Sequence, residues 1–146
     1  LGPVSVLDIS EKALEATKAR LGRKADRVEW IVADITKWQP DRTFALWHDR
    51  AVFHFLTDRD DQAAYVRTMH EALRPRGIAI IATFAEDGPE KCSGLAVVRY
   101  SPDTLAQTLE ELTPGGFEPV ESRRHVHITP KGNRQAFQIS VFRKTA

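Results

Sequence analysis

The sequence has few of the features that mark secreted, zinc-binding or membrane-spanning proteins. Its 146 residues include a single cysteine, Cys92, so it has no internal disulfide framework and no cysteine-based zinc site. Its longest apolar runs, such as residues 78–83, are far shorter than the roughly 20 residues that a membrane-spanning helix needs. We therefore expect no association with a membrane, and the cysteine usage favours a cytoplasmic location.

Neither sign of charge dominates the sequence. Lys and Arg number 21 against 20 Asp and Glu, which gives a formal net charge of +1. This balance provides no strong electrostatic reason to bind nucleic acid. Basic residues do gather between Arg123 and Lys144, but no aromatic residues alternate with them, so we interpret them as a solvated sheet edge. His125 and His127 lack an evident third ligand, so we expect no metal site.

The length and composition are those of one globular domain, which we place at residues 1–146. Hydrophobic residues make up 42% of the chain and charged residues 28%, close to the average for soluble proteins. The chain begins Leu1-Gly2-Pro3, without an initiator Met or a signal-peptide pattern. We therefore expect the domain to be incomplete at its N-terminus.

The pattern of apolar residues predicts strands that alternate with helices. Strands are expected at residues 4–7, 28–33, 44–47, 78–84, 117–128 and 135–142, and helices at 11–21, 60–73 and 102–112. Pro75-Arg76-Gly77 predicts a turn, and residues 86–99 predict a loop that covers a substrate. The alternation indicates an α/β, Rossmann-like three-layer sandwich with a mostly parallel sheet and an antiparallel C-terminal strand pair.

Three consecutive predicted strands end in an aspartate, namely Asp8, Asp34 and Asp49. Ligands of open α/β sheets bind at the carboxyl ends of the strands, and a carboxylate there can accept hydrogen bonds from both hydroxyls of a ribose. Each aspartate alone is also typical of a helix cap or a turn. Three at equivalent positions favour a shared ligand-binding edge.

Four segments resemble, in order, motifs of the class I S-adenosylmethionine-dependent methyltransferases. They are Val6-Leu7-Asp8-Ile9-Ser10 before a helix rich in Lys, Ala and Leu, Val32-Ala33-Asp34-Ile35, the segment from Trp47 to Leu56, and Leu73-Arg74-Pro75-Arg76-Gly77-Ile78. The resemblance covers nearly the whole chain. It implies S-adenosyl-L-methionine as the cofactor and a small molecule as the methyl acceptor.

The resemblance also implies roles for individual residues. Asp8 would accept hydrogen bonds from the cofactor ribose, and Asp34 from the adenine amino group. Ile9 would pack on the adenine face, with the Ile35 backbone near the ring edge. The remaining implied residues are Asp49 and Arg50 near the methionine part and Phe53 and His54 toward the acceptor. His54 is the candidate general base, although it would equally suit packing between two phenylalanines.

The sequence departs from the family at its start. The family's first strand, its glycine-rich loop and its first helix have no counterpart here. In the family, that strand lies between the strands that here end in Asp8 and carry His48. Its absence would leave two unpaired strand edges. The edges could pair with each other, a homodimer or strand swap could fill the gap, or the protein could have a further segment, which we favour.

Two other functions fit parts of the pattern. Asp8 would suit the ribose of a dinucleotide, so an NAD(P)-dependent oxidoreductase is one alternative, although no glycine fingerprint or Tyr-x-x-x-Lys pair supports it. The missing glycine-rich loop favours a second alternative, a non-catalytic Rossmann-like remnant that serves as a dimerising or binding module.

Overall fold

The computed structural model describes residues 2–146, and it divides the chain into two compact units. The first unit ends at Gln39 and the second runs from Pro40 to Ala146. Each unit is described separately below. Our expectation of a single domain stays a prediction. Within residues 2–146, no helix combines the length and the apolar character that crossing a bilayer requires.

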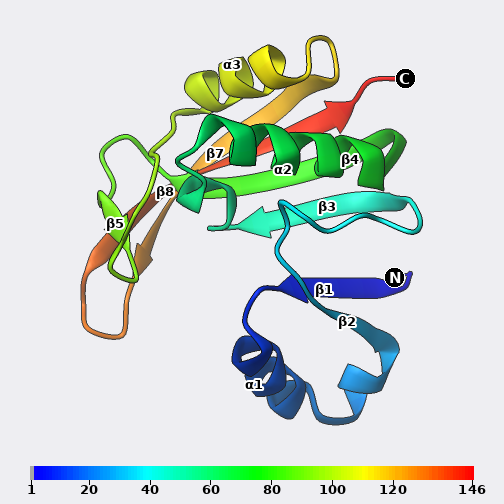
Figure 1. Cartoon of the computed structure of the whole chain (residues 1–146). Helices are drawn as coiled ribbons and strands as arrows, with labels where there is room; N and C mark the ends of the chain where they lie inside the picture. The colour runs from blue at the N-terminus through cyan, green and yellow to red at the C-terminus, as the bar shows by residue number, and fades with distance from the viewer. Residues whose placement is uncertain (1) are drawn as a thin grey trace. The chain divides into compact units, whose positions relative to one another are not determined.

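The first unit is a β-α-β element. Strands β1 (Val4–Asp8) and β2 (Val28–Val32) pair in parallel, and helix α1 (Glu11–Leu21) and the 3₁₀ helix η1 (Gly22–Arg27) connect them (Figure 1). The Ser10 hydroxyl accepts a hydrogen bond from the backbone of Ala13 at 3.1 Å and so begins α1. Gly22, with a φ of +57°, ends the helix as the sequence predicts.

The second unit is a mixed four-stranded sheet in the order β3-β4-β8-β7. Strand β3 is parallel to β4, whereas β8 is antiparallel to both β4 and β7, which confirms the antiparallel C-terminal pair. Helices α2 and α3 lie side by side over one face of this sheet (Figure 1). The elements are β3 (Phe44–Arg50), η2 (Phe53–Phe55), α2 (Arg59–Ala72), β4 (Leu73–Phe84), β5 (Lys91–Cys92), β6 (Leu95–Ala96), α3 (Pro102–Leu112), β7 (Phe117–Ile128) and β8 (Arg134–Lys144).

The largest differences from the prediction lie in β4 and in the segment 86–99, and the bounds of the other elements agree to within about three residues. Strand β4 begins at Leu73 and includes the predicted turn, because Leu73 already pairs with Phe44. The turn survives as a kink at Arg76, whose φ is +66°, and as a shift in the β3–β4 register. The second difference lies in the predicted loop at 86–99, which contains the short antiparallel hairpin β5–β6.

The core of the second unit lies between its sheet and helices α2 and α3. The helices contribute side chains at helical spacing, and β4 and β8 contribute alternate residues. The fully buried side chains include Tyr65, Met69, Leu73, Ile81, Leu105, Leu109 and Phe142. A smaller cluster of Ala82, Phe84 and Phe137 packs against the partly buried Cys92 and Val97 of the hairpin segment. The carboxyl ends of β3 and β4 are therefore held from both sides.

Gly77 permits close packing beside the kink in β4, and replacing it with alanine should destabilise the protein. A Cβ atom there would lie 2.9 Å from the Arg74 carbonyl oxygen and 3.2 Å from the Ala45 carbonyl oxygen. We expect Gly77→Ala to lower the free energy of unfolding by about 1–3 kcal/mol in urea denaturation. Gly2→Ala is the control, because a Cβ at Gly2 meets nothing within 4 Å. Equal stability of the two variants would contradict the packing described here.

Candidate functional site

The first unit brings Asp8 and Asp34 to the same edge of its two-stranded sheet. Asp8 is the last residue of β1 and lies in register with Val32, the last residue of β2. Asp34 follows β2 by two residues, and the Ala33 backbone N–H donates to the Asp8 carbonyl oxygen at 3.1 Å. Two carboxylates thus follow the carboxyl ends of two neighbouring parallel strands.

Each of these carboxylates keeps one oxygen available. In Asp8, Oδ1 accepts from the Ser10 backbone at 2.8 Å. In Asp34, Oδ1 accepts from the backbone and the hydroxyl of Thr36 at 2.9 and 2.7 Å. These hydrogen bonds from Thr36 lower the pKa of Asp34, so the group is a carboxylate at neutral pH. Across residues 2–146, neither Oδ2 has a hydrogen-bond partner, so each can accept from a ligand.

An apolar side chain lies exposed beside Asp8. Ile9 is 71% exposed, although isoleucine is among the residues most often buried, whereas Ile35 is half-buried. A large apolar side chain next to free carboxylate oxygens suits a ligand that has both a flat apolar ring and hydroxyl or amino donors. The first unit alone thus presents two free carboxylate oxygens and one exposed apolar side chain, and their role in binding a cofactor stays a prediction.

In the second unit, Asp49 organises the segment that follows β3. Its side chain is buried, and its two oxygens accept hydrogen bonds from the Val52 and Phe53 backbones at 2.9 and 3.0 Å. The Tyr65 hydroxyl of α2 donates to Oδ2 at 2.5 Å and in turn accepts from the Trp47 indole at 3.0 Å. Asp49 therefore connects the strand, the following turn and helix α2.

Burial and hydrogen bonding act on Asp49 in opposite directions. Desolvation raises the pKa of Asp49, while the bonds from Tyr65, Val52 and Phe53 oppose that rise. Burial, together with the neighbouring carboxylate, raises the pKa of Tyr65 well above its ordinary value, so the phenol remains a hydrogen-bond donor. Sequence reasoning missed Tyr65, because nothing in the pattern of α2 distinguishes it from a simple core residue.

The turn after β3 has a strained backbone. Ala51 has a φ of +64°, in the left-handed region that residues with a side chain seldom adopt. Its N–H donates to the Ala82 carbonyl oxygen at 2.9 Å, and the Asp49 bonds hold the next two residues. Backbone strain that the surroundings impose in this way is concentrated at functional sites in proteins.

Arg50 presents an exposed cation at the end of β3. Its guanidinium carbon lies 5.5 Å from the centre of the Phe137 ring. Within the described part of the chain, no carboxylate pairs with Arg50. Arg50, which the resemblance places near the methionine part of the cofactor, is therefore exposed and without a carboxylate partner among the described residues, and its placement there stays a prediction.

The structure buries both residues that were predicted to face the acceptor. Phe53 and His54 are 0% exposed. The Phe53 ring packs against Tyr65 and Tyr100, with centroids 4.8 and 5.6 Å apart. The His54 ring packs against Phe55 and Phe84. Both side chains are thus part of the packed aromatic core next to the carboxyl ends of β3 and β4.

The hydrogen bonds of His54 favour a positioning role over proton abstraction. Nδ1 accepts from the Phe84 backbone N–H at 3.1 Å, so in the neutral ring the proton lies on Nε2, which has no partner among the described residues. Burial lowers the pKa of His54 to about 4. The ring therefore has no free lone pair with which to take a proton in this conformation, and its role as a base stays a prediction.

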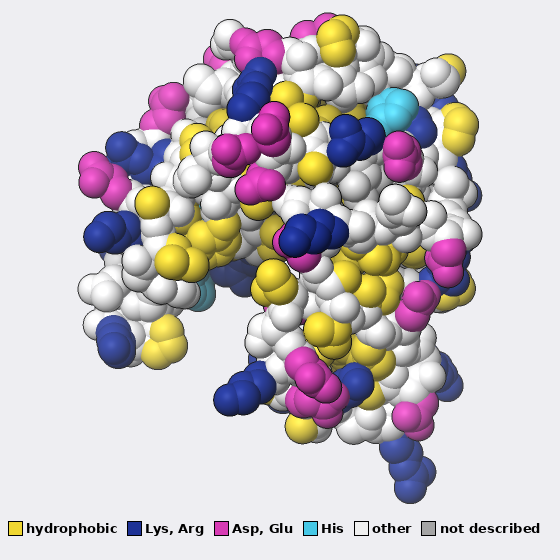
Figure 2. Space-filling view, viewed as in Figure 1, with side chains coloured by type: hydrophobic (Ala, Val, Ile, Leu, Met, Phe, Trp, Pro, Cys, Tyr) yellow, Lys and Arg dark blue, Asp and Glu magenta, His cyan; other side chains and the backbone are white. Residues whose placement is uncertain are grey.

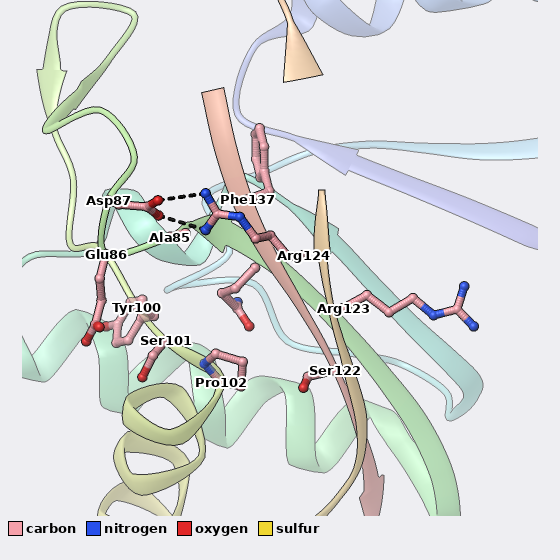
Figure 3. A pocket seen from close by; sticks show the side chains of 11 residues that line it. Ala85, Glu86, Asp87, Tyr100, Ser101, Pro102, Ser122, Arg123, Arg124 and Phe137 are labelled. Carbon is pink, nitrogen blue, oxygen red and sulfur yellow. Dashed lines mark hydrogen bonds and ion pairs between the residues drawn. The ribbon is translucent and has the colours of Figure 1, made fainter. Parts of the chain in front are cut away.

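A pocket of about 300 Å³ opens beside the end of β4 (Figure 3). Its walls come from the residues after β4, the start of α3, and strands β7 and β8. The lining includes Glu86, Asp87, Tyr100, Ser101, Ser122, Arg123, Arg124 and Gln138. Glu86 and Asp87 belong to the loop that was predicted to cover a substrate. The other lining residues were not predicted to form a site, because an antiparallel strand pair and the start of α3 bring them together only in the folded chain.

One ion pair joins two walls of this pocket. Arg124 of β7 donates two parallel hydrogen bonds to the Asp87 carboxylate, at 2.8 and 2.6 Å. The guanidinium lowers the pKa of Asp87, so both groups are charged at neutral pH. Elsewhere on the visible face of the second unit, acidic and basic side chains are interspersed (Figure 2).

Two comparisons by sequence match methyltransferases. A family model described as "Methyltransferase domain" matches residues 2–77. Malonyl-[acyl-carrier protein] O-methyltransferase 2 of Ilyobacter polytropus is 27% identical over 84 residues, which are 58% of this chain and 31% of that protein. The chain thus matches about a third of the length of this curated relative.

Solved structures share the fold. The N-methyltransferase NodS from Bradyrhizobium japonicum, in complex with S-adenosyl-L-homocysteine, has a TM-score of 0.73 at 16% identity, over 97% of this chain and 66% of that one. The 1,6-didemethyltoxoflavin-N1-methyltransferase from Burkholderia thailandensis, with 1,6-didemethyltoxoflavin and S-adenosylhomocysteine bound, has a TM-score of 0.72 at 23% identity. That match covers 99% of this chain and 62% of the other.

Removing the Tyr65 hydroxyl tests the network around Asp49. We expect Tyr65→Phe to lower the free energy of unfolding by about 1.5–3 kcal/mol, because a buried carboxylate loses a donor. Tyr100→Phe is the matched control, since Tyr100 is also buried but its hydroxyl has no hydrogen bond within residues 2–146. It should change stability by less than about 0.5 kcal/mol. Chemical denaturation of both variants measures the contrast, and similar losses would contradict it.

The neutral state of His54 predicts a loss of stability in acid. The unfolded chain protonates His54 below its ordinary pKa of 6.5, whereas the folded chain resists protonation down to about 4. The contribution is therefore fully present above pH 6.5 and is lost as the pH falls through 4, by at most about 3 kcal/mol. His54→Asn keeps an acceptor for the Phe84 N–H but does not titrate.

Denaturation of the wild type and His54→Asn at pH 7, 5.5 and 4 measures this effect. The difference in free energy of unfolding between the two proteins should narrow as the pH falls. A difference that stays constant over this range would show that His54 is protonated equally well in the folded chain.

Proposed function

This chain belongs to the class I S-adenosylmethionine-dependent methyltransferases, and from that premise we propose that it transfers the methyl group of S-adenosyl-L-methionine to a small molecule. The observation that carries the proposal is the pair of ligand-accepting carboxylates, Asp8 and Asp34, at one strand edge, with the exposed Ile9 beside them. The bound cofactor would supply a methyl group made electrophilic by its positive sulfur.

The first unit would hold the nucleoside part of the cofactor. The free oxygen of Asp8 would accept from the ribose hydroxyls, and the free oxygen of Asp34 from the adenine amino group. Ile9 would cover one face of the adenine, and the Ile35 backbone would lie at its edge. The lowered pKa of Asp34 supports this role in binding the amino group. An ionised carboxylate only accepts hydrogen bonds, whereas a protonated carboxyl group also donates one.

The second unit would contribute to the methionine part and to the acceptor. Asp49 and the strained Ala51 would fix the floor, and the exposed Arg50 would pair with the carboxylate of the cofactor. Phe53 and His54, whose side chains are buried, would support the site by holding the ends of β3 and β4 together. Alignment and desolvation of the reacting groups would then supply most of the rate enhancement.

Strands β1 and β3 each have one unpaired edge among the described residues, and this supports pairing with a further strand. In the described residues, β1 has one ladder partner, β2, and β3 has one, β4. Each strand therefore has an edge whose backbone groups can bind another strand. We propose that a further part of the protein, or a second copy through dimerisation or a strand swap, supplies it. The proposal retains a cytoplasmic location, which the single cysteine favours.

Two alternatives make different predictions about binding. An NAD(P)-dependent oxidoreductase would also use Asp8 on a ribose, but the family match is to methyltransferases. A non-catalytic remnant would bind none of these cofactors. Titration of the chain with S-adenosylmethionine, S-adenosylhomocysteine and NAD in a calorimeter separates the three, and we expect heat from the first two only.

Asp8→Asn tests the carboxylate itself. The asparagine Oδ1 still accepts from the Ser10 backbone, but an amide donor replaces the free acceptor oxygen. We expect the affinity for S-adenosylhomocysteine to fall by more than about tenfold, the loss of one charge-assisted hydrogen bond. Asp26→Asn, an exposed aspartate in η1, is the control and should bind as the wild type does. Unchanged affinity in Asp8→Asn would remove Asp8 from the site.

A further inference from the structure

We propose that the pocket beside β4 binds a small molecule that carries a protonated amine, with Glu86 as the group that recognises it. This proposal rests on the proposed function in one respect, which is that it makes the amine-bearing molecule the methyl acceptor. The methyl group would go to another nucleophilic atom of that molecule, which releases its proton to solvent, because the protonated nitrogen has no lone pair. The pocket is formed entirely by the second unit. None of its residues belongs to the groups assigned to the cofactor above.

Two of the four charged side chains that line the pocket compensate each other. Asp87 and Arg124 neutralise each other through two hydrogen bonds, and an incoming anion would have to displace Asp87 from the guanidinium. Figure 3 shows the Arg123 side chain extending away from the other labelled side chains. Neither arginine is therefore free to bind a ligand inside the pocket.

Glu86 supplies the charge that remains. Its carboxylate has no hydrogen bond or ion pair with any of the described residues. Figure 3 shows the Glu86 side chain extending alongside Tyr100. An ammonium group beside this carboxylate would gain an ion pair, and the Tyr100 hydroxyl, which has no hydrogen bond within residues 2–146, would accept a hydrogen bond from it. Because the Arg123 side chain extends away, Glu86 is the unpaired charged group that remains for a ligand, and it favours a cation.

Two of the neutral polar side chains in the lining, those of Gln138 and Ser101, already have hydrogen-bond partners and so compete little for a ligand. The Gln138 amide donates to the Ile81 carbonyl and the Thr83 hydroxyl, and its oxygen accepts from Ser140. The Ser101 hydroxyl caps α3. Ser122, by contrast, has no side-chain partner within residues 2–146 and remains available to the rest of the ligand. Recognition therefore depends on Glu86, Tyr100 and Ser122.

The position and size of the pocket suit a small acceptor. Tyr100 donates its backbone N–H to the Phe84 carbonyl at 3.0 Å, and its ring contacts Phe53. The pocket therefore begins at the same carboxyl edge of β3 and β4 that Asp49 and His54 organise. A volume of about 300 Å³ is at the lower end of the range for small-molecule sites.

Three probes of similar shape and different charge test the proposal. We would titrate the 146-residue chain with 2-phenylethylamine, 2-phenylethanol and 3-phenylpropanoate and follow the NMR signals of the Tyr100 ring. The amine should bind about fivefold more tightly than the alcohol, and the carboxylate more weakly than either. Equal affinity for the three, or preference for the carboxylate, would overturn the proposal.

Two variants locate the binding site. Glu86→Gln should remove the preference for the amine, whereas Glu121→Gln, an exposed glutamate of β7 outside the lining, should retain it. Ser122→Phe should fill the pocket and abolish binding of all three probes. Retention of the preference in Glu86→Gln would show that another group recognises the amine.

Titration of the same sample with S-adenosylhomocysteine distinguishes this proposal from the proposed function. Binding of S-adenosylhomocysteine without the amine preference would overturn the assignment of the pocket and leave the cofactor assignment intact. The reverse result would establish an amine-binding pocket in a chain that does not bind the cofactor, and it would overturn the role of the amine-bearing molecule as the methyl acceptor.

Discussion

The buried carboxylate of Asp49 is the interaction on which the second unit's functional edge depends. It accepts hydrogen bonds from the two residues that follow the strained Ala51 and from Tyr65 of α2. A buried charge is costly unless it is hydrogen-bonded. Here the donors are backbone groups of the turn and the hydroxyl on α2, so the same hydrogen bonds also fix the conformation of the turn. The strand end, the turn and the helix are therefore fixed together, and Phe53 and His54 take their positions from that arrangement.

Much of the fold could be predicted because its signals are local. The strand that ends at Asp8, a helix capped by Ser10 and an antiparallel C-terminal pair all follow from patterns of adjacent residues. The exceptions depend on pairing between distant residues. Leu73 extends β4 through a proline and a glycine because Phe44 lies opposite it. Residues within 86–99 form a hairpin whose composition resembles that of a loop.

The candidate site was predictable only where it coincides with strand ends. Asp8 and Asp34 follow apolar runs, so their shared edge could be read from the sequence, and their chemistry stays a proposal. The burial of His54, the hydroxyl of Tyr65 and the lining of the pocket could not be read in this way. Each of them depends on contacts between elements far apart in the chain, such as His54 with Phe84 and Asp87 with Arg124.

The link between Asp87 and Arg124 has a consequence for the solution conditions under which the pocket keeps its shape. The pair is exposed, and it ties the residues after a central strand to the outermost strand of the sheet. At about 1 M salt the Debye length shrinks to about 3 Å, and exposed ion pairs weaken. High ionic strength should therefore weaken this ion pair and widen the opening of the pocket, while the buried hydrogen bonds beneath it persist.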